Sequence, residues 1–178
     1  MHLNPYGEYA VLLAAELAGD FPASREGVVA CTRAHGMTVD FPPAEDDLVR
    51  VREVVDTWLA VVDAPGAAER AALLNELMAA AAAYPRLVDH DDEGWHLHYR
   101  DPGQRLPQVL ASVIGVGTAL HLTTRGMHRL HRCAAGPAVG DGCTRVVVDV
   151  TRGGRQRYCS TRCASRAGVR RHRARQGS

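Results

Sequence analysis

Tyr158-Cys159-Ser160-Thr161-Arg162-Cys163-Ala164-Ser165-Arg166 is the stretch of this 178-residue chain that decides how its C-terminal part folds. Serine caps helix N-termini well, so Ser160 predicts a helix that starts here and reaches about Arg175. Cys159 then lies just before the helix and Cys163 lies in its first turn. Both thiols can therefore face one point, and the positive end of the helix dipole favours their thiolate forms.

Two further cysteines precede this stretch, in the spacing Cys133-x9-Cys143-x15-Cys159-x3-Cys163. Four thiolates match a tetrahedral structural zinc site with no open coordination position. Between them, 145–150 is β-branched and apolar and predicts a strand, 151–154 predicts a turn, and 155–158 predicts the returning strand. About 45 residues with so few large apolar groups cannot hold a stable core unaided. They need a cross-link between their segments, and inside a reducing cell this is usually a bound metal ion.

The sequence therefore predicts a treble-clef-like zinc module of a β-hairpin and a helix, with Zn²⁺ held by Cys133, Cys143, Cys159 and Cys163. Two alternatives stay open. The cysteines could be free thiols or disulfides, although disulfides are rare in the cytosol. His128 or His131 could replace Cys133, because a gap of nine residues exceeds the usual two to four.

The charge distribution divides the chain at about the same place. Residues 1–124 hold 8 arginines and 18 acidic residues, a formal charge of −10, whereas 125–178 hold 13 arginines and 2 acidic residues, a formal charge of +11. An asymmetry of this size indicates different partners for the two parts. We therefore expect two domains, an acidic one at 1–124 and a basic one at 125–178.

Arginines are concentrated on the predicted C-terminal helix and around the predicted hairpin. Arg162, Arg166, Arg170 and Arg173 follow helical spacing and form one stripe, in which like charges repel unless an anion neutralises them. Arginine makes bidentate contacts with phosphates and guanine edges, which makes nucleic acid, and first of all duplex DNA, the expected partner. The predicted contact residues are Arg152, Arg155, Arg157, Arg162, Arg166, Arg170, Arg171 and Arg173. Docking on an acidic protein surface, including the acidic part of this chain, and a solvated tail are the alternatives.

The acidic part predicts a mainly α-helical domain with a small β-hairpin. Apolar residues recur at helical spacing over 6–17, 24–34, 41–65, 67–83 and 106–132, the last with candidate breaks at Gly115 and Gly126. The short alternating segment Trp95–Tyr99 predicts a strand or hairpin arm. The fold class is therefore mainly α, with the zinc module at the C-terminus.

Other residue clusters offer less. His96 and His98 share one face of the predicted strand and follow the acidic segment His90–Glu93, so a catalytic metal is one hypothesis and an exposed polar hairpin the plainer one. Cys31 and His35 are four residues apart on a predicted helix and suggest a core cysteine and a surface histidine. No phosphate-binding loop or nucleophile elbow occurs, and we expect no enzymatic activity.

The N-terminus has no basic segment ahead of an apolar core, and apolar runs such as Ala79–Tyr84 are far too short to cross a membrane. We therefore expect a cytoplasmic protein without a membrane partner.

The C-terminal part resembles the CGNR zinc-finger family, whose members carry an N-terminal ABATE domain and are described as stress-induced transcription regulators. The matching features are the cysteine pair, the strand Val146–Asp149, the Arg-rich turn, and Tyr158–Ser160. Cys163-Ala164-Ser165-Arg166 stands where the family has Cys-Gly-Asn-Arg, so the cysteine and arginine are kept and the Gly-Asn pair is not. Leu73–Leu77 resembles a Leu-Asn segment of the N-terminal domain.

The resemblance implies a helical N-terminal domain, a zinc role for the cysteines, and a regulatory function. Together with the residues it leads to one expectation: a zinc-binding, nucleic-acid-binding transcriptional regulator. Its N-terminal domain would sense an unidentified small-molecule effector or self-associate as a homodimer. The rival hypothesis is a protein–protein interaction module whose zinc finger binds an acidic surface.

Overall fold

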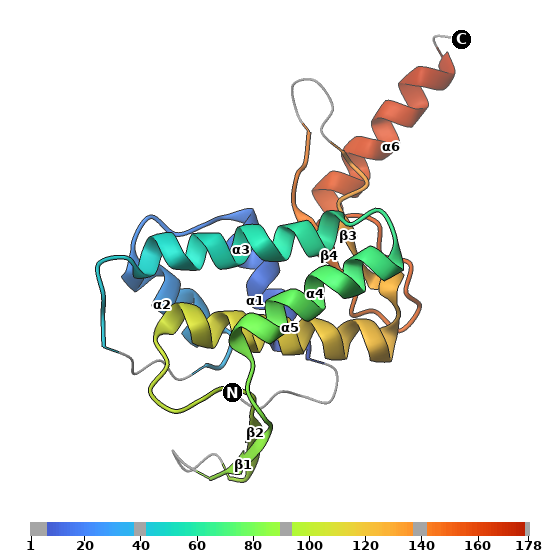
Figure 1. Ribbon diagram of the computed structural model, residues 1–178. Coiled ribbons are helices and arrows are strands. Elements are labelled where there is room, and N and C mark those ends of the chain that lie inside the picture. The colour runs from blue at the N-terminus through green and yellow to red at the C-terminus, as the bar shows by residue number, and fades with distance from the viewer. Residues whose placement is uncertain (1–6, 38–41, 90–93, 137–141, 177–178) are drawn as a thin grey trace.

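The computed structural model describes residues 7–37, 42–89, 94–136 and 142–176, and within them the chain is mainly helical, as predicted (Figure 1). The helices are α1 Glu8–Gly19, α2 Arg25–Ala34, α3 Asp47–Asp63, α4 Ala67–Ala81, α5 Leu106–Arg125 and α6 Thr161–Gln176, with a 3₁₀ turn η1 at Met127–Arg129. The strands are β1 Arg86–Val88, β2 His96–His98, β3 Leu130–Arg132 and β4 Val146–Val148.

The main core forms around α5, which packs against α1, α3 and α4. Trp58 of α3 is fully buried in this core, and its indole N–H donates to Thr118 Oγ1 of α5 at 2.9 Å. Gly117 lets α1 approach α5 closely, since a Cβ there would lie 2.4 Å from the Cβ of Ala10. The predicted core-forming helices are therefore confirmed, and one of them is the centre of the domain.

By length and composition α5 could cross a membrane. Most of it is buried among the other helices, however, as expected for the central helix of a globular core.

A buried carboxylate joins three elements at the start of α3. The side chain of Asp47 is 1% exposed and accepts hydrogen bonds from Arg25 Nε at 2.9 Å and Arg105 Nη2 at 2.7 Å. Burial acts to raise the pKa of Asp47, but the hydrogen bonds from these two guanidinium groups outweigh it and lower the pKa. The carboxylate is therefore charged throughout the neutral range.

This predicts a measurable pH dependence of stability. The charged Asp47 side chain contributes to the free energy of unfolding. This contribution is fully present above the unfolded-state pKa of about 3.9 and is lost as the pH falls through the lower folded-state pKa. We expect Asp47→Asn to lower the free energy of unfolding at pH 7 by about 2–4 kcal/mol and to weaken its acid dependence, measured by urea denaturation. Asp56→Asn, at an exposed position of the same helix, is the matched control, and an equal loss there would contradict the assignment.

The predicted hairpin arm at Trp95–Tyr99 is confirmed. β2 pairs antiparallel with β1, with Leu87 opposite Leu97, and both leucines are exposed together with Trp95. This hairpin lies at the opposite end of the molecule from α6 (Figure 1).

The strand predicted around 146–148 is present, but the strand predicted to pair with it is wrong. β4 pairs antiparallel with β3, with Leu130 opposite Val148, whereas 155–158 forms no strand. The long helix predicted over 106–132 ends at Arg125, because Gly126 adopts φ +111°, a conformation that side chains other than glycine rarely adopt. The residues after Gly126 form η1 and then β3. Of the two candidate breaks, Gly115 lies within α5 and Gly126 ends it.

The β3–β4 hairpin contributes to two cores at once. Val146 and Val148 face the main core together with Leu130, and Val147 on the opposite face of β4 packs in a second cluster with the cysteines. Arg132 of β3 also forms a two-point ion pair with Asp63 at the end of α3, at 2.7 and 2.6 Å. These contacts attach the basic part to the helical domain, and the predicted domain boundary at 124/125 stays a prediction.

Candidate metal centre

The four cysteines of the C-terminal part meet in one place. Their sulfur atoms all lie within 4.8 Å of one another, with Cys143 Sγ 3.5 Å and Cys163 Sγ 3.6 Å from Cys159 Sγ. Cys133 follows β3, Cys143 precedes β4, Cys159 precedes α6, and Cys163 lies in its first turn. All but Cys159 are buried. This arrangement provides four sulfur ligands for a tetrahedral metal ion.

The local backbone explains why the sulfurs point inward. Ser160 caps α6 as predicted, since its Oγ accepts from the Cys163 backbone N–H at 3.2 Å. The backbone N–H of Cys159 donates to Cys133 Sγ at 3.4 Å. Such N–H groups stabilise negative charge on sulfur, as thiolate ligands of a metal require.

The surroundings of Cys163 and Cys159 shift the pKa values of these two thiols in opposite directions. A hydrogen bond from the Ser160 hydroxyl to the thiol, followed by the guanidinium of Arg166 3.6 Å from Sγ, lowers the pKa of Cys163 to about 6. Burial and the hydrogen bonds to the other cysteines raise the pKa of Cys159 to about 12. The cluster therefore shares protons among its sulfurs, and these are the protons that a bound cation would displace.

The described residues do not support the alternatives to a four-cysteine site, which were disulfides and a histidine in place of Cys133. A disulfide needs sulfurs about 2.05 Å apart, whereas Cys143 and Cys159 are at 3.5 Å, and all five cysteines are free. His131 is engaged elsewhere, since its two ring nitrogens lie 2.9 Å from Arg132 O and 3.0 Å from Gln156 O. His128 lies in η1, outside the group of metal-ligating atoms that the described residues form here. Cys133 is thus the fourth residue of the cluster.

Asp149, immediately after β4, organises the loop that leads to Cys159, a role the sequence interpretation did not assign. Its buried carboxylate accepts from Thr151 N at 2.9 Å, Thr151 Oγ1 at 2.5 Å and Gln156 N at 2.9 Å. Burial acts to raise its pKa, but these hydrogen bonds outweigh it and lower the pKa. The available signal was an aspartate two residues before Thr151 of a Thr-Arg-Gly-Gly turn, the spacing that is typical of an Asx turn.

We expect Asp149→Asn to loosen this loop, because the amide accepts fewer hydrogen bonds than the carboxylate and brings unmatched donors. The expected cost is about 1–3 kcal/mol in the free energy of unfolding, with faster loss of the cysteine-bound metal to a chelator. Chelator-competition kinetics measure the second effect. Asp63→Asn removes the ion pair with Arg132 instead, so metal release that is fastest in that variant would contradict the role of Asp149.

The structure separates the predicted contact arginines into two groups. Three of them hold the module together: Arg166 donates to Cys163 Sγ at 3.6 Å, Arg170 to Ala135 O at 2.5 Å, and Arg171 to Tyr158 OH at 2.8 Å. Of these three only Arg166 is half-buried. The arginines of the second group are exposed and make no such hydrogen bond among the described residues, and they are Arg152, Arg155, Arg157, Arg162 and Arg173. Arg145, which the sequence interpretation left out, lines a cleft with Arg162 and Arg166 beside the cysteines.

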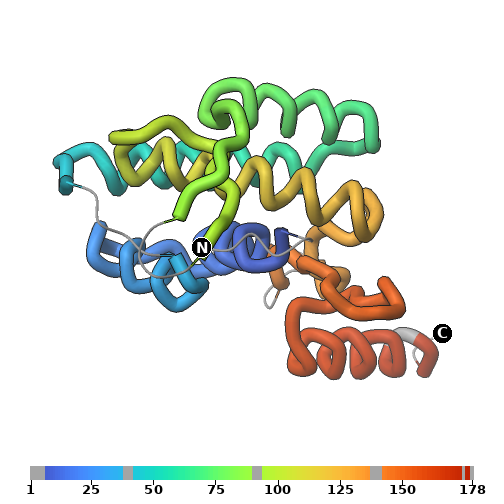
Figure 2. The backbone as a smooth tube through the Cα atoms, turned by 90° about the horizontal axis from the view of Figure 1, so that it is seen from below, coloured from blue at the N-terminus to red at the C-terminus, as the bar shows by residue number. Residues whose placement is uncertain are grey.

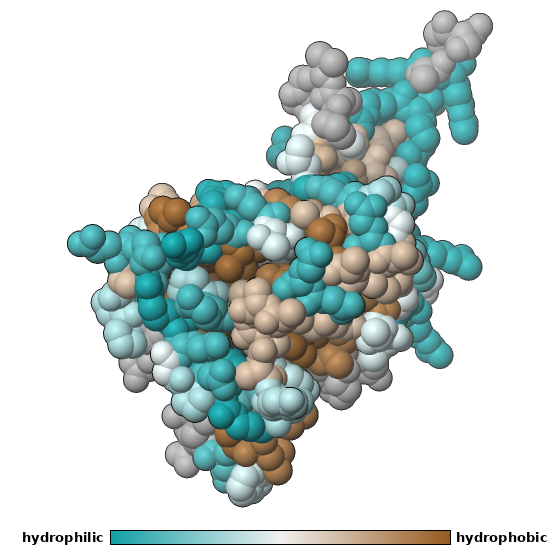
Figure 3. All heavy atoms as spheres, in the orientation of Figure 1, coloured by the Kyte–Doolittle hydropathy of each residue, from teal (hydrophilic) through white to brown (hydrophobic). Residues whose placement is uncertain are grey.

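α6 extends away from the helical domain, and its surface is hydrophilic along most of its length (Figures 1 and 3). Within the described part of the chain, no carboxylate forms an ion pair with Arg162, Arg170, Arg171 or Arg173. Docking of the arginine stripe on the acidic part of the same chain is therefore not seen among those residues. Glu45–Asp47 lies elsewhere, and two of its carboxylates are bound by Arg105.

The second histidine cluster is only partly described. His96 Nε2 lies 3.1 Å from His98 Nε2, and His96 Nδ1 lies 2.8 Å from Gly94 O. The acidic segment His90–Glu93 lies outside the described residues. The hypothesis of a catalytic metal there stays untested.

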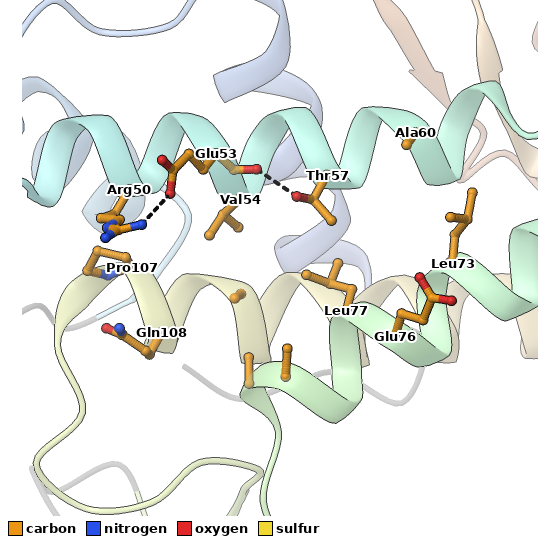
Figure 4. A pocket seen from close by; sticks show the side chains of 13 residues that line it. Arg50, Glu53, Val54, Thr57, Ala60, Leu73, Glu76, Leu77, Pro107 and Gln108 are labelled. Atoms are coloured by element: carbon orange, nitrogen blue, oxygen red, sulfur yellow. Dashed lines mark hydrogen bonds and ion pairs between the residues drawn. The ribbon is translucent and has the colours of Figure 1, made fainter.

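The helical domain carries an apolar groove of about 350 Å³ between α3, α4 and α5. Figure 4 shows Val54, Leu73 and Leu77 along its walls, with Arg50 and Glu53 at the rim joined by a hydrogen bond of 3.0 Å. Alanines from all three helices leave the space open. A cavity of this size and composition suits a small apolar molecule.

A helical domain fastened to a four-cysteine metal module with a projecting basic helix defines a metal-finger protein of two parts. Residues 11–138, more than half of the chain, match the ABATE family, described as "Putative stress-induced transcription regulator", and the chain belongs to this family. Residues 129–176 match the CGNR zinc finger. The comparison with curated proteins gave no match. The two matched ranges share 129–138, the segment that carries β3 and Cys133 and contributes to both cores.

Proposed function

We propose that this protein regulates transcription by binding nucleic acid, most simply duplex DNA, through arginines that a zinc-organised module displays. The observation that carries the proposal is α6, a helix that projects from the module with exposed arginines. Zn²⁺ at Cys133, Cys143, Cys159 and Cys163 would fix the start of this helix against the β3–β4 hairpin. The proposed role is non-catalytic and cytoplasmic.

Charge and geometry support an anionic partner. Arg162 and Arg173 are exposed and belong to one helical stripe, whose like charges are relieved when phosphates lie beside them. Arg145, Arg162 and Arg166 line one cleft at the N-terminus of α6, where the helix dipole also favours an anion. A phosphate in this cleft would be contacted by groups that the metal holds in place.

Zn²⁺ is the metal that this ligand set favours. Four thiolates in tetrahedral positions suit Zn²⁺, which takes up Cys₄ sites with no open position. Elemental analysis of the full chain purified without added metal tests this, and we expect one zinc at the four-cysteine cluster. Iron at that cluster in place of zinc would overturn the assignment.

A salt titration of DNA binding by the full chain tests the main proposal. Five to eight phosphate contacts predict a slope of roughly −4.5 to −7 in a plot of log K against log salt concentration for duplex DNA. Fluorescence anisotropy with a labelled duplex gives this slope directly. A poly-glutamate peptide of equal charge serves as the comparison, and tighter binding of that peptide than of DNA would favour the rival function, docking on an acidic protein surface.

The groove of Figure 4 is the place in the helical domain where we propose that a small-molecule effector binds. Its apolar walls and polar rim fit an apolar molecule with a polar end. Ala111→Phe would fill the groove from α5, and we expect it to abolish the fluorescence increase of an apolar dye such as ANS. Retention of the full dye signal would reject this site.

Self-association is the other proposed role of the helical domain. The β1–β2 hairpin exposes Leu87, Trp95 and Leu97, and a hydrophobic patch lies at that end of the molecule in Figure 3. Exposed patches of this kind are typical of protein contacts. We expect a concentration-dependent dimer in sedimentation experiments, weakened by Trp95→Ser; a monomer at all concentrations would exclude it.

A further inference from the structure

A second group of metal-ligating atoms lies between α1 and α2, apart from the four-cysteine cluster. Glu16 of α1, Cys31 of α2 and His35 at the C-terminal end of α2 bring one oxygen, one sulfur and one nitrogen within 4.8 Å of one another. His35 Nε2 lies 2.7 Å from Glu16 Oε2. The sequence interpretation took Cys31 and His35 as a core cysteine and a surface histidine and missed the carboxylate that joins them.

The fold holds these three donors in position from two helices. Cys31 and His35 are four residues apart and therefore lie one above the other on one face of α2. Glu16 reaches them from α1, which packs against α2 (Figure 2). The two helices are joined by the short segment at residues 20–24, so the three donors come from two consecutive helices that are in contact.

Helix electrostatics give an independent reason for a cation here. Glu16 lies in the last turn of α1, which ends at Gly19 and has no basic residue in that turn. Cys31 lies in the last turn of α2, which also carries Arg33, and His35 caps its C-terminus. The negative ends of two helix dipoles thus lie next to the cluster, and this is where a cation is stabilised.

We propose that Glu16, Cys31 and His35 form a second metal site, which takes a divalent cation of the zinc class. Thiolate, imidazole and carboxylate together suit Zn²⁺ or Co²⁺ better than Mg²⁺ or Ca²⁺, which prefer oxygen ligands alone. Three protein ligands leave a fourth position for water. None of its ligands belongs to the four-cysteine cluster, and it requires no bound nucleic acid.

The required rearrangement is small. Metal bonds of about 2.0 Å to nitrogen and oxygen place the two ligand atoms about 3.3 Å apart in a tetrahedral site, against 2.7 Å for His35 and Glu16 now. The cation would replace the proton that these atoms share, and the Cys31 thiol would release its proton to solvent. Burial, followed by the Glu16 carboxylate, raises the pKa of Cys31 to about 12, so a metal-free Cys31 is a poor nucleophile.

A neighbouring arginine acts against cation binding at this site. The guanidinium of Arg145 lies against Gly19 and contributes to the lowered pKa of Glu16. Its positive charge opposes a cation at the cluster, and we expect Arg145→Gln to tighten cation binding. Arg145 is two residues from Cys143, so the two metal sites are linked through this side chain.

Cobalt titration of the full chain loaded with one equivalent of zinc, which occupies the four-cysteine cluster, tests the proposal. We expect one equivalent of Co²⁺ to bind without release of zinc and to give the sulfur-to-cobalt charge-transfer band of a single thiolate. Cys31→Ser should remove the band, His35→Gln should weaken binding at least tenfold, and Arg145→Gln should strengthen it. His128→Gln, a change at an exposed histidine outside the cluster, is the matched control and should bind as the unmodified chain does.

Two results would overturn the proposal: no cobalt taken up beyond exchange with the zinc, or an unchanged thiolate band in Cys31→Ser. Thermal melts of each variant without cobalt separate loss of a ligand from loss of the fold, and Glu16→Gln provides a third test at an exposed position. Failure of DNA binding leaves this measurement unaffected, because the cobalt signal requires no nucleic acid.

Discussion

Replacement of Cys159 by serine is expected to release the metal of the four-cysteine cluster and to unfold α6, while the helical domain stays folded. The second apolar cluster consists mainly of the cysteines themselves, with Val147 and Ala135 as its other buried members. Burying one valine contributes only about 1.5–3 kcal/mol. Structural zinc contributes roughly 10–16 kcal/mol in zinc-finger peptides, so little else holds this part of the chain.

Hydrogen exchange followed by mass spectrometry distinguishes the two parts. We expect amides of 150–176 to lose their protection in Cys159→Ser, whereas those of α5 keep it. β4 should retain part of its protection, because Val146 and Val148 are packed in the main core. Cys31→Ser removes a cysteine outside the cluster and should leave α6 protected; persistence of α6 protection in Cys159→Ser would mean that the module does not depend on the metal.

The second large effect concerns the exposed arginines of α6. We expect the double variant Arg162→Gln, Arg173→Gln to weaken binding to duplex DNA about 10- to 100-fold near physiological salt and to reduce the salt slope by about 2. Each exposed guanidinium that contacts a phosphate releases about one counterion, and this release is lost with the charge. Arg166 and Arg170 are less suitable, because they donate to Cys163 Sγ and Ala135 O.

Arg86→Gln on β1 is the matched control, since it removes an arginine at the opposite end of the molecule (Figure 1). It should leave both affinity and slope unchanged. Equal weakening by Arg86→Gln would indicate a response to net charge only. An unchanged affinity in the double variant would mean that α6 serves a partner other than nucleic acid.

Local signals in the sequence predicted those parts of the fold that depend on neighbouring residues. Ser160 and the spacing Cys-x3-Cys predicted a capped helix with two thiols at its start, and the structure has this arrangement. Ser24 likewise caps α2, with its Oγ accepting from Gly27 N at 3.2 Å. Caps and helical periodicity act within one or two turns, so a single segment contains the whole signal.

Contacts between distant segments were predicted less well. The apolar strand at 146–148 was identified, but its partner was assigned to the following segment rather than to β3. A strand of three residues pairs equally well by local rules with several segments, and burial of Leu130 in the main core decides between them. The carboxylate of Glu16 was missed for the same reason, since its partners Cys31 and His35 lie on another helix.

By itself the sequence determined which segments contain a helix, which residues carry the charge, and which four cysteines are available to a metal. Only the tertiary structure decided that the β3–β4 hairpin belongs to two cores, that Arg166 and Arg170 brace the module, and that Glu16 joins Cys31 and His35. The physical reason is that propensity, capping and charge are properties of short segments. Burial and ligand geometry exist only once segments far apart in the chain are packed together.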